Sequence, residues 1–282
     1  MFKIVEKRIL NDSMTLMAVE APFIAKKAKA GQFIILRVNE FGERIPLTVA
    51  DYDREKGTIT IIYQKVGKTT LMLDQLNEGD EILDFIGPLG KASELEGYKN
   101  VAVIGGGAGC AIAYPQAKAL HSMGAKVDMI AGFRNKDIII LEDEMKAASD
   151  RLIITTDDGS NGNKGFVTDA LRKNIEEGTK YDLVIAIGPL VMMRAICNLT
   201  KEYNIKTLIS MNPIMIDGTG MCGGCRLTVG GKTKFACVDG PDFDGHEVDF
   251  DEAIKRSRTY SDLEKEATHE YNCHLMEGAN NA

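Results

Sequence analysis

The stretch Val101-Ala102-Val103-Ile104-Gly105-Gly106-Gly107-Ala108-Gly109 joins a continuous apolar run to a cluster of glycines. Continuous apolar runs are typical of parallel strands that are buried on both faces. Similar runs predict strands at 127–131, 151–155, 182–187 and 207–211, and helices are expected between them near 112–123, 167–177 and 190–203. Strands that alternate with helices indicate a doubly wound parallel sheet, so this part of the chain is expected to be an α/β domain.

The glycine cluster stands at the turn between the first of these strands and a helix. Bare backbone and a positive helix N-terminus at such a turn favour the binding of a pyrophosphate. The strict G-x-G-x-x-G form is not met, because Cys110 occupies the third glycine position, and a glycine turn without a ligand stays an alternative. The strand at 127–131 also lacks the acidic residue that usually reads the ribose, since Arg134 follows it. The candidate nucleotide-binding residues are Gly105, Gly106, Gly107, Ala108 and Gly109.

The first 97 residues have a different pattern. Short apolar or alternating runs at 33–38 and 58–63 are separated by turn residues, which is typical of an all-β barrel or sandwich. A helix is expected at about 69–76, with Gly79 as its stop signal. The sequence therefore predicts an all-β domain at 1–97, an α/β domain at 98–211, a small module at 212–267 and a disordered tail at 268–282.

Three cysteines lie close together in the third of these regions. Cys222 and Cys225 are separated by two residues, and Cys237 follows eleven residues further on. With Asp217 in the first position, the spacing resembles the C-x4-C-x2-C pattern of plant-type [2Fe–2S] sites, with a carboxylate in place of one thiolate. A zinc ribbon also uses a C-x2-C pair, with His246 as the remaining candidate ligand, and Asp217 alone can instead cap a turn. The candidate metal ligands are Asp217, Cys222, Cys225 and Cys237.

Composition narrows the classes of function. The 282 residues carry a formal net charge of −7, and no basic stripe with interleaved aromatics is present, so no nucleic-acid partner is expected. No apolar run is long enough to span a bilayer, and the N-terminus has no apolar signal region. The chain is therefore expected to be cytoplasmic and not bound to a membrane.

These segments, in this order, resemble the ferredoxin–NADP reductase superfamily. The stretch 44–48 is similar to its first flavin segment, 66–70 to its second, and 187–193 to its C-G-P-x-x-M segment, with Ile187 in the usual Cys position. The resemblance implies an N-terminal FAD-binding β-barrel and an NAD-binding domain, with Cys110 near the nicotinamide. It implies FAD-binding residues at Arg44, Pro46, Leu47, Thr48, Tyr63, Gln64, Lys65, Gly67, Thr69 and Thr70, and nicotinamide-nucleotide residues at Gly188, Pro189 and Met192.

Two carboxylates bear on the choice of nucleotide. Asp157 and Asp158 follow the strand at 151–155, where like-charge repulsion disfavours a 2′-phosphate. Arg134 and Lys136 have the opposite effect. We therefore expect NADH in preference to NADPH at this site.

The cysteine cluster narrows the resemblance to the branch of electron-transfer subunits. This branch includes the subunits of dihydroorotate dehydrogenase B, which normally have four Cys ligands, and the small subunits of NADH-dependent ferredoxin:NADP oxidoreductases, to which the D-x4-C-x2-C-x11-C set is similar. The resemblance implies hydride transfer from NADH to FAD and electron transfer to a [2Fe–2S] cluster. It also implies a heterodimer with a larger iron–sulfur flavoprotein, which serves ferredoxin indirectly by electron bifurcation. The alternatives are a dihydroorotate or sulfide dehydrogenase-type subunit and a zinc-stabilised nucleotide-binding module.

Overall fold

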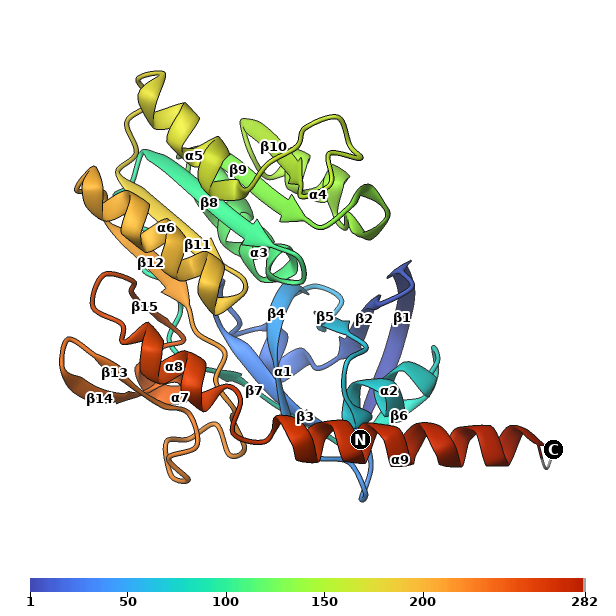
Figure 1. The fold of residues 1–282 in the computed structure, drawn as a ribbon. Helices are drawn as coiled ribbons and strands as arrows, with labels where there is room; N and C mark the ends of the chain where they lie inside the picture. Colours follow the sequence, from blue (N-terminus) through green and yellow to red (C-terminus); the bar gives the residue numbers. More distant parts are fainter. Residues whose placement is uncertain (281–282) are drawn as a thin grey trace.

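Two large sheets organise the computed structural model, which describes residues 1–280 (Figure 1). The first sheet is antiparallel and curls into a nearly closed barrel with the strand order β6-β1-β2-β5-β4-β3-β7. Its inward-facing side chains form a core that includes Ile34, Leu36, Ile59 and Ile61, which confirms the expected all-β domain. The elements are β1 (Phe2–Asn11), β2 (Met14–Glu20), α1 (Pro22–Ala25), β3 (Phe33–Arg37), β4 (Ile45–Asp53), β5 (Thr58–Gln64), α2 (Lys68–Gln75), β6 (Glu81–Ile82) and β7 (Asp84–Leu89).

The second sheet has the order β10-β9-β8-β11-β12-β15, and its first five strands are parallel. Helices α3 and α4 pack on one face, while α5 and α6 pack on the other, so the expected doubly wound arrangement is confirmed. The elements are β8 (Asn100–Gly106), α3 (Gly109–Ser122), β9 (Lys126–Phe133), η1 (Lys136–Ile138), α4 (Glu142–Ala147), β10 (Arg151–Thr156), α5 (Val167–Glu176), β11 (Leu183–Ile187), α6 (Leu190–Glu202) and β12 (Thr207–Ser210).

The C-terminal region is joined to the second sheet by one short strand. Strand β15 pairs antiparallel with β12, so that Asp242 lies opposite Ser210. The expected boundary at 211 therefore divides the sequence but not the sheet. The elements are β13 (Arg226–Val229), β14 (Lys232–Phe235), α7 (Ala236–Asp239), β15 (Asp242–Asp244), α8 (Phe250–Arg256) and α9 (Ser261–Asn280).

The expected disordered tail differs from the structure. Residues 268–280 continue α9, which contacts α2 beside the barrel, while residues 281–282 lie outside the described residues. Residues 268–277 contain neither Gly nor Pro, so this polar sequence has no helix-breaking residue before Gly278. Within residues 1–280, no helix is long and apolar enough to cross a membrane.

Candidate functional site

A pair of buried thiols marks the cysteine cluster. The sulfur atoms of Cys225 and Cys237 lie 3.2 Å apart, and each residue is 1% exposed. Cys225 directly precedes β13, whereas Cys237 lies in α7, so the β13–β14 hairpin brings the two sulfurs together. The backbone N–H of Cys237 also points at the Cys225 sulfur, at 3.5 Å.

Asp217 and Cys222 lie on the glycine-rich loop that leads to this pair. The carboxylate of Asp217 accepts backbone hydrogen bonds from Thr219 at 2.9 Å, Met221 at 3.1 Å and Cys222 at 2.8 Å. These bonds, led by the one from Thr219, hold the pKa of Asp217 below its ordinary value. In the described part of the chain, no three His, Cys, Asp or Glu side chains converge on one point, so the structure joins two of the four predicted ligands and leaves two on the adjoining loop.

Glycines let the loop pack closely against the barrel. Gly218, Gly220 and Gly223 all have positive φ, and a Cβ on Gly218 would lie 2.7 Å from side-chain atoms of Ile35 and Leu89. The loop therefore packs directly against β3 and β7 of the barrel. A backbone N–H from Gly220 also lowers the pKa of Cys237, though less than burial raises it. Buried sulfurs that receive backbone N–H groups fit the chemistry of an iron–sulfur cluster.

The second predicted FAD segment forms the turn at the start of α2. The Thr70 hydroxyl accepts from the Gly67 N–H at 3.1 Å and donates to its carbonyl at 2.9 Å, which fixes the turn. The hydroxyl of Thr69 is buried and has no partner among the described residues, and the space beside Gly67 is open. An unpartnered buried hydroxyl is costly, so this site fits a missing acceptor such as a phosphate.

The other predicted FAD residues differ in their exposure and in their polar partners. Arg44 is exposed and makes no ion pair with a described residue, while Pro46, Leu47 and Thr48 lie half-buried on β4. Two of the predicted FAD residues, Tyr63 and Lys65, instead have a polar partner within the barrel domain. Tyr63 is 2% exposed and donates to Asp74 at 3.3 Å, and the ammonium group of Lys65 pairs with Asp74 at 3.4 Å. The Tyr63 side chain belongs to the barrel core, whereas Gln64 is exposed.

The glycine turn after β8 packs tightly against the start of α6. A Cβ on Gly106 would overlap the sulfur of Met192, and one on Gly109 would overlap the carbonyl of Ile187. A Cβ on Gly188 would lie 3.2 Å from the Gly106 nitrogen, beside Pro189. Ala108 and Gly109 begin α3, where the first N–H groups have no partner within the helix. The structure thus brings together the two predicted nucleotide segments.

Cys110 is buried behind this turn rather than exposed on it. Its side chain is 0% exposed and belongs to the core between α3 and the sheet, where burial raises the pKa of the thiol to about 12. Gly105 leaves the space that the sulfur fills, since a Cβ there would lie 2.8 Å from it. The predicted place of Cys110 near the nicotinamide therefore finds no support in its burial.

Asp157 and Asp158 directly follow β10, at the carboxyl end of the sheet. Their backbone N–H groups bond the carbonyls of Phe133 at 3.0 Å and Arg134 at 3.3 Å, which joins this loop to the end of β9. Hydrogen bonds from Ser160 hold the pKa of the exposed Asp158 below its ordinary value. Both carboxylates are solvent-exposed.

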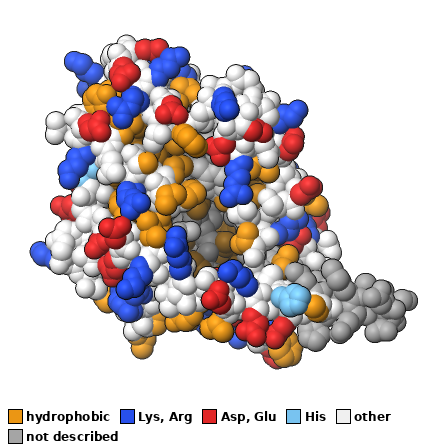
Figure 2. Space-filling model, viewed as in Figure 1, with side chains coloured by type: hydrophobic (Ala, Val, Ile, Leu, Met, Phe, Trp, Pro, Cys, Tyr) orange, Lys and Arg blue, Asp and Glu red, His pale blue; other side chains and the backbone are white. Residues whose placement is uncertain are grey.

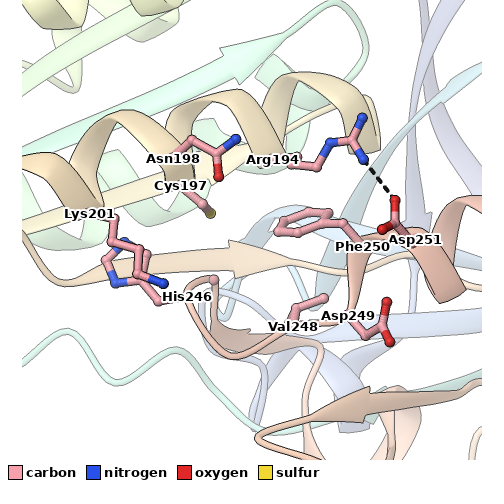
Figure 3. Close-up of a pocket in the computed structure, with 10 residues that line it drawn as sticks. Arg194, Cys197, Asn198, Lys201, His246, Val248, Asp249, Phe250 and Asp251 are labelled. Carbon is pink, nitrogen blue, oxygen red and sulfur yellow. Dashed lines mark hydrogen bonds and ion pairs between the residues drawn. The ribbon is translucent and has the colours of Figure 1, made fainter.

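Figure 2 shows a hollow near the centre of one face, with hydrophobic and basic side chains round its rim. A pocket of about 270 Å³ lies between α6 and the segment 245–251, which leads into α8. In Figure 3, Arg194 reaches from α6 to Asp251, and Lys201 lies beside His246. None of the predicted cofactor residues lines this pocket, and sequence reasoning gave no signal for it because its walls come from distant segments.

Comparison with protein families supports two of the three modules. Residues 103–198 match the oxidoreductase NAD-binding domain, and residues 212–249 match the iron–sulfur cluster binding domain of dihydroorotate dehydrogenase B. The second match contains all four predicted metal ligands. The chain is therefore an oxidoreductase-type protein with an NAD-binding domain and an iron–sulfur domain.

Whole-chain relatives extend these matches. A protein of Thermotoga maritima described as a homolog of the dihydroorotate dehydrogenase B (NAD(+)) electron transfer subunit is 48% identical, over 93% of each chain. The electron transfer subunit of Fusobacterium nucleatum is 32% identical over 83% of this chain and 92% of its own. A solved structure of the NADH-dependent reduced ferredoxin-NADP oxidoreductase, studied for flavin-based electron bifurcation, matches with 46% identity and a TM-score of 0.90, over 95% of this chain and 97% of the other.

Proposed function

Because this chain belongs to the family of the dihydroorotate dehydrogenase B electron-transfer subunits and their homologues, we propose that it is the small subunit of an electron-bifurcating NADH-dependent ferredoxin:NADP oxidoreductase. It oxidises NADH through FAD and passes electrons to a [2Fe–2S] cluster. The observation that carries this proposal is the buried thiol pair of Cys225 and Cys237 beside the barrel, in a chain with an NAD-binding domain.

Each module has a distinct task. FAD, when bound, takes an electron pair as hydride and releases electrons singly, as a cluster requires. Arg44 and Thr69 are suited to hold its phosphates, because one is an unpaired cation and the other an unpartnered buried hydroxyl among the described residues. The start of α3 at Gly109 attracts the dinucleotide pyrophosphate. The carboxylates of Asp157 and Asp158 disfavour a 2′-phosphate and so favour NADH.

A partner subunit completes the reaction. The relatives are named as electron transfer subunits, which implies a larger assembly. Ile216, Met221 and Val238, which are 53%, 88% and 38% exposed, surround the cysteine loop with apolar side chains. An exposed apolar patch beside an electron-carrying site favours docking of another protein there. We propose that this partner is a larger iron–sulfur flavoprotein that serves ferredoxin and NADP.

The dihydroorotate dehydrogenase B subunit is the second candidate, because the iron–sulfur family match carries that name. Asp217 in the first ligand position favours the bifurcating enzyme. Affinity purification of the chain from its native cells distinguishes the two. Recovery of an iron–sulfur flavoprotein supports the first proposal, and recovery of a dihydroorotate-oxidising chain supports the second.

A visible spectrum and a reduction assay test the function itself. The purified chain is expected to have flavin bands and a broad iron–sulfur absorption, and NADH should bleach the flavin faster than NADPH does. A colourless protein with zinc would refute the redox function. Faster bleaching by NADPH would refute only the choice of nucleotide.

A further inference from the structure

The carboxyl group of Asp242 lies where all three parts of the chain meet. Ser93, in the segment that follows the barrel, donates its hydroxyl to the Oδ2 atom of Asp242 at 2.5 Å. Gln116, on α3 of the nucleotide-binding domain, donates its side-chain amide to the same oxygen at 3.1 Å. Asp242 itself lies on β15, so one oxygen atom links the C-terminal module to both other domains.

Two acceptors in this cluster lack donors. The Oδ1 atom of Asp242 and the Oε1 atom of Gln116 are buried, and neither has a hydrogen-bond partner among the described residues. An ionised carboxylate can only accept hydrogen bonds, whereas a protonated one also donates. Protonation of Asp242 therefore turns one of the unpartnered acceptors into a donor and removes an uncompensated buried charge.

Among the described residues, the groups that shift the pKa of Asp242 include no charged side chain. Burial raises the pKa of Asp242, and the weaker opposing effects come from the neutral side chains of Ser93, Ser210 and Gln116. These groups face it from the segment after the barrel, from β12 and from α3. Lys91 contributes only a backbone N–H, which bonds the Gly240 carbonyl at 2.6 Å.

Asp242 lies at one end of the segment that carries the cysteines. Ser210 is the last residue of β12 before the cysteine loop, and Asp242 follows Cys237 by five residues. The two residues lie opposite each other in the β12–β15 pair, and the Met211 N–H bonds the Pro241 carbonyl at 2.9 Å. Both ends of the segment 212–241 are thus fixed at one point, and that segment carries all four predicted metal ligands.

We propose that the neutral carboxyl group of Asp242 clamps the segment 212–241 onto the barrel and the nucleotide-binding domain, and that ionisation of this group loosens the clamp. Asp242 is a positioning residue, which sets where the cysteine loop lies against β3 and β7. That the segment 212–241 carries an iron–sulfur cluster rests on the proposed function, whereas the clamp does not depend on it.

Backbone hydrogen exchange of the segment 212–241, in the full chain with its cofactors, tests this proposal. A carboxyl group whose folded pKa is raised contributes stability that is fully present below its ordinary value of about 4. That stability is lost as pH rises through the folded pKa. The exchange rates are first corrected for their intrinsic pH dependence. Between about pH 4 and the folded pKa of Asp242, opening of the wild-type segment should then increase about tenfold per pH unit.

Three variants separate the clamp from simple packing. Asp242→Asn keeps a neutral, hydrogen-bonding side chain, so its opening should lack the pH-dependent increase. Asp242→Ala should open more than Asp242→Asn at every pH. Asp244→Asn is the matched control, because it lies on the same strand, has a side chain 43% exposed and should keep the wild-type profile. Infrared spectra should contain a protonated-carboxyl band that Asp242→Asn removes and Asp244→Asn retains.

Two results would overturn the clamp. One is an identical pH profile in the wild-type chain and in Asp242→Asn, and the other is equal opening in Asp242→Asn and Asp242→Ala. Iron content is measured on the same samples. A wild-type chain that contains no iron would refute the proposed function, while the exchange comparison would still decide on the clamp.

Discussion

The turn between β8 and α3 permits a quantitative test with two matched substitutions. In Gly109→Ala, the new methyl group would overlap the Ile187 carbonyl and lie 2.8 Å from the Gly188 Cα atom. Both obstacles are backbone at the end of β11, so they cannot rotate away. The start of α3 must instead move off the strand, and the helix N-terminus moves with it.

The size of the effect follows from this geometry. Forcing an extra methyl group into a close-packed site costs about 1–3 kcal/mol, and backbone obstacles favour the upper end. The midpoint of thermal unfolding should fall by roughly 2–12 °C, at about 2–4 °C per kcal/mol for a chain of this size class. In Gly106→Ala the main obstacle is the end of the flexible Met192 side chain, and the Pro189 ring lies further off at 3.3 Å, so the cost should stay near the lower end, about 1 kcal/mol.

Thermal unfolding and NADH titration of the two variants provide the assay. Gly109→Ala should lose more stability than Gly106→Ala and should bind NADH more weakly, while both retain FAD. An equal or larger loss in Gly106→Ala would refute the argument, because it would mean that the backbone at Ile187 yields more easily than the Met192 side chain.

Three further predictions concern other sites. Asp217→Ala should lose more than half of the iron and Asp217→Cys should retain it with a shifted reduction potential; metal analysis and redox titration that find no change in either would remove Asp217 from the ligand set. Thr69→Val should leave the flavin-free chain as stable or about 1 kcal/mol more stable, because it deletes an unpartnered hydroxyl, yet it should release FAD faster in a dilution assay. Burial raises the pKa of Asp74, but the Thr15 hydroxyl and the Lys65 ammonium group lower it to a net value below the ordinary one. Its stabilising contribution is therefore present above about pH 4 and lost as pH falls through the lower folded pKa, so acid unfolding of Asp74→Asn should be less steep.

Much of the fold could be predicted from local patterns. Strands β8 and β11 contain continuous apolar runs because both of their faces are covered, and that pattern needs no knowledge of distant residues. Strand β15 has three residues, two of them acidic, and forms only because β12 offers an open edge. A pairing of that kind has no local signal.

The residues of the candidate site likewise include some that local sequence patterns predicted and some that they did not. The resemblance of the cysteine spacing to a [2Fe–2S] pattern grouped Cys225 with Cys237, but it gave no sign of the β13–β14 hairpin that brings their sulfur atoms to 3.2 Å. Tyr63 lies within a predicted segment, yet the alternation of β5 turns its side chain into the barrel. Asp242 and Gln116 escaped prediction because 126 residues separate them in the chain.

Strand β15 also limits how this protein can be rearranged. A recombinant fragment that ends at residue 211 would leave β12 as a bare sheet edge, which is a template for aggregation. Conversely, a transplanted cysteine segment would lose the strand that fixes its exit. Gene fusions and truncations that treat the two parts as separable units should therefore place their junction after Asp244, where the chain has completed the sheet.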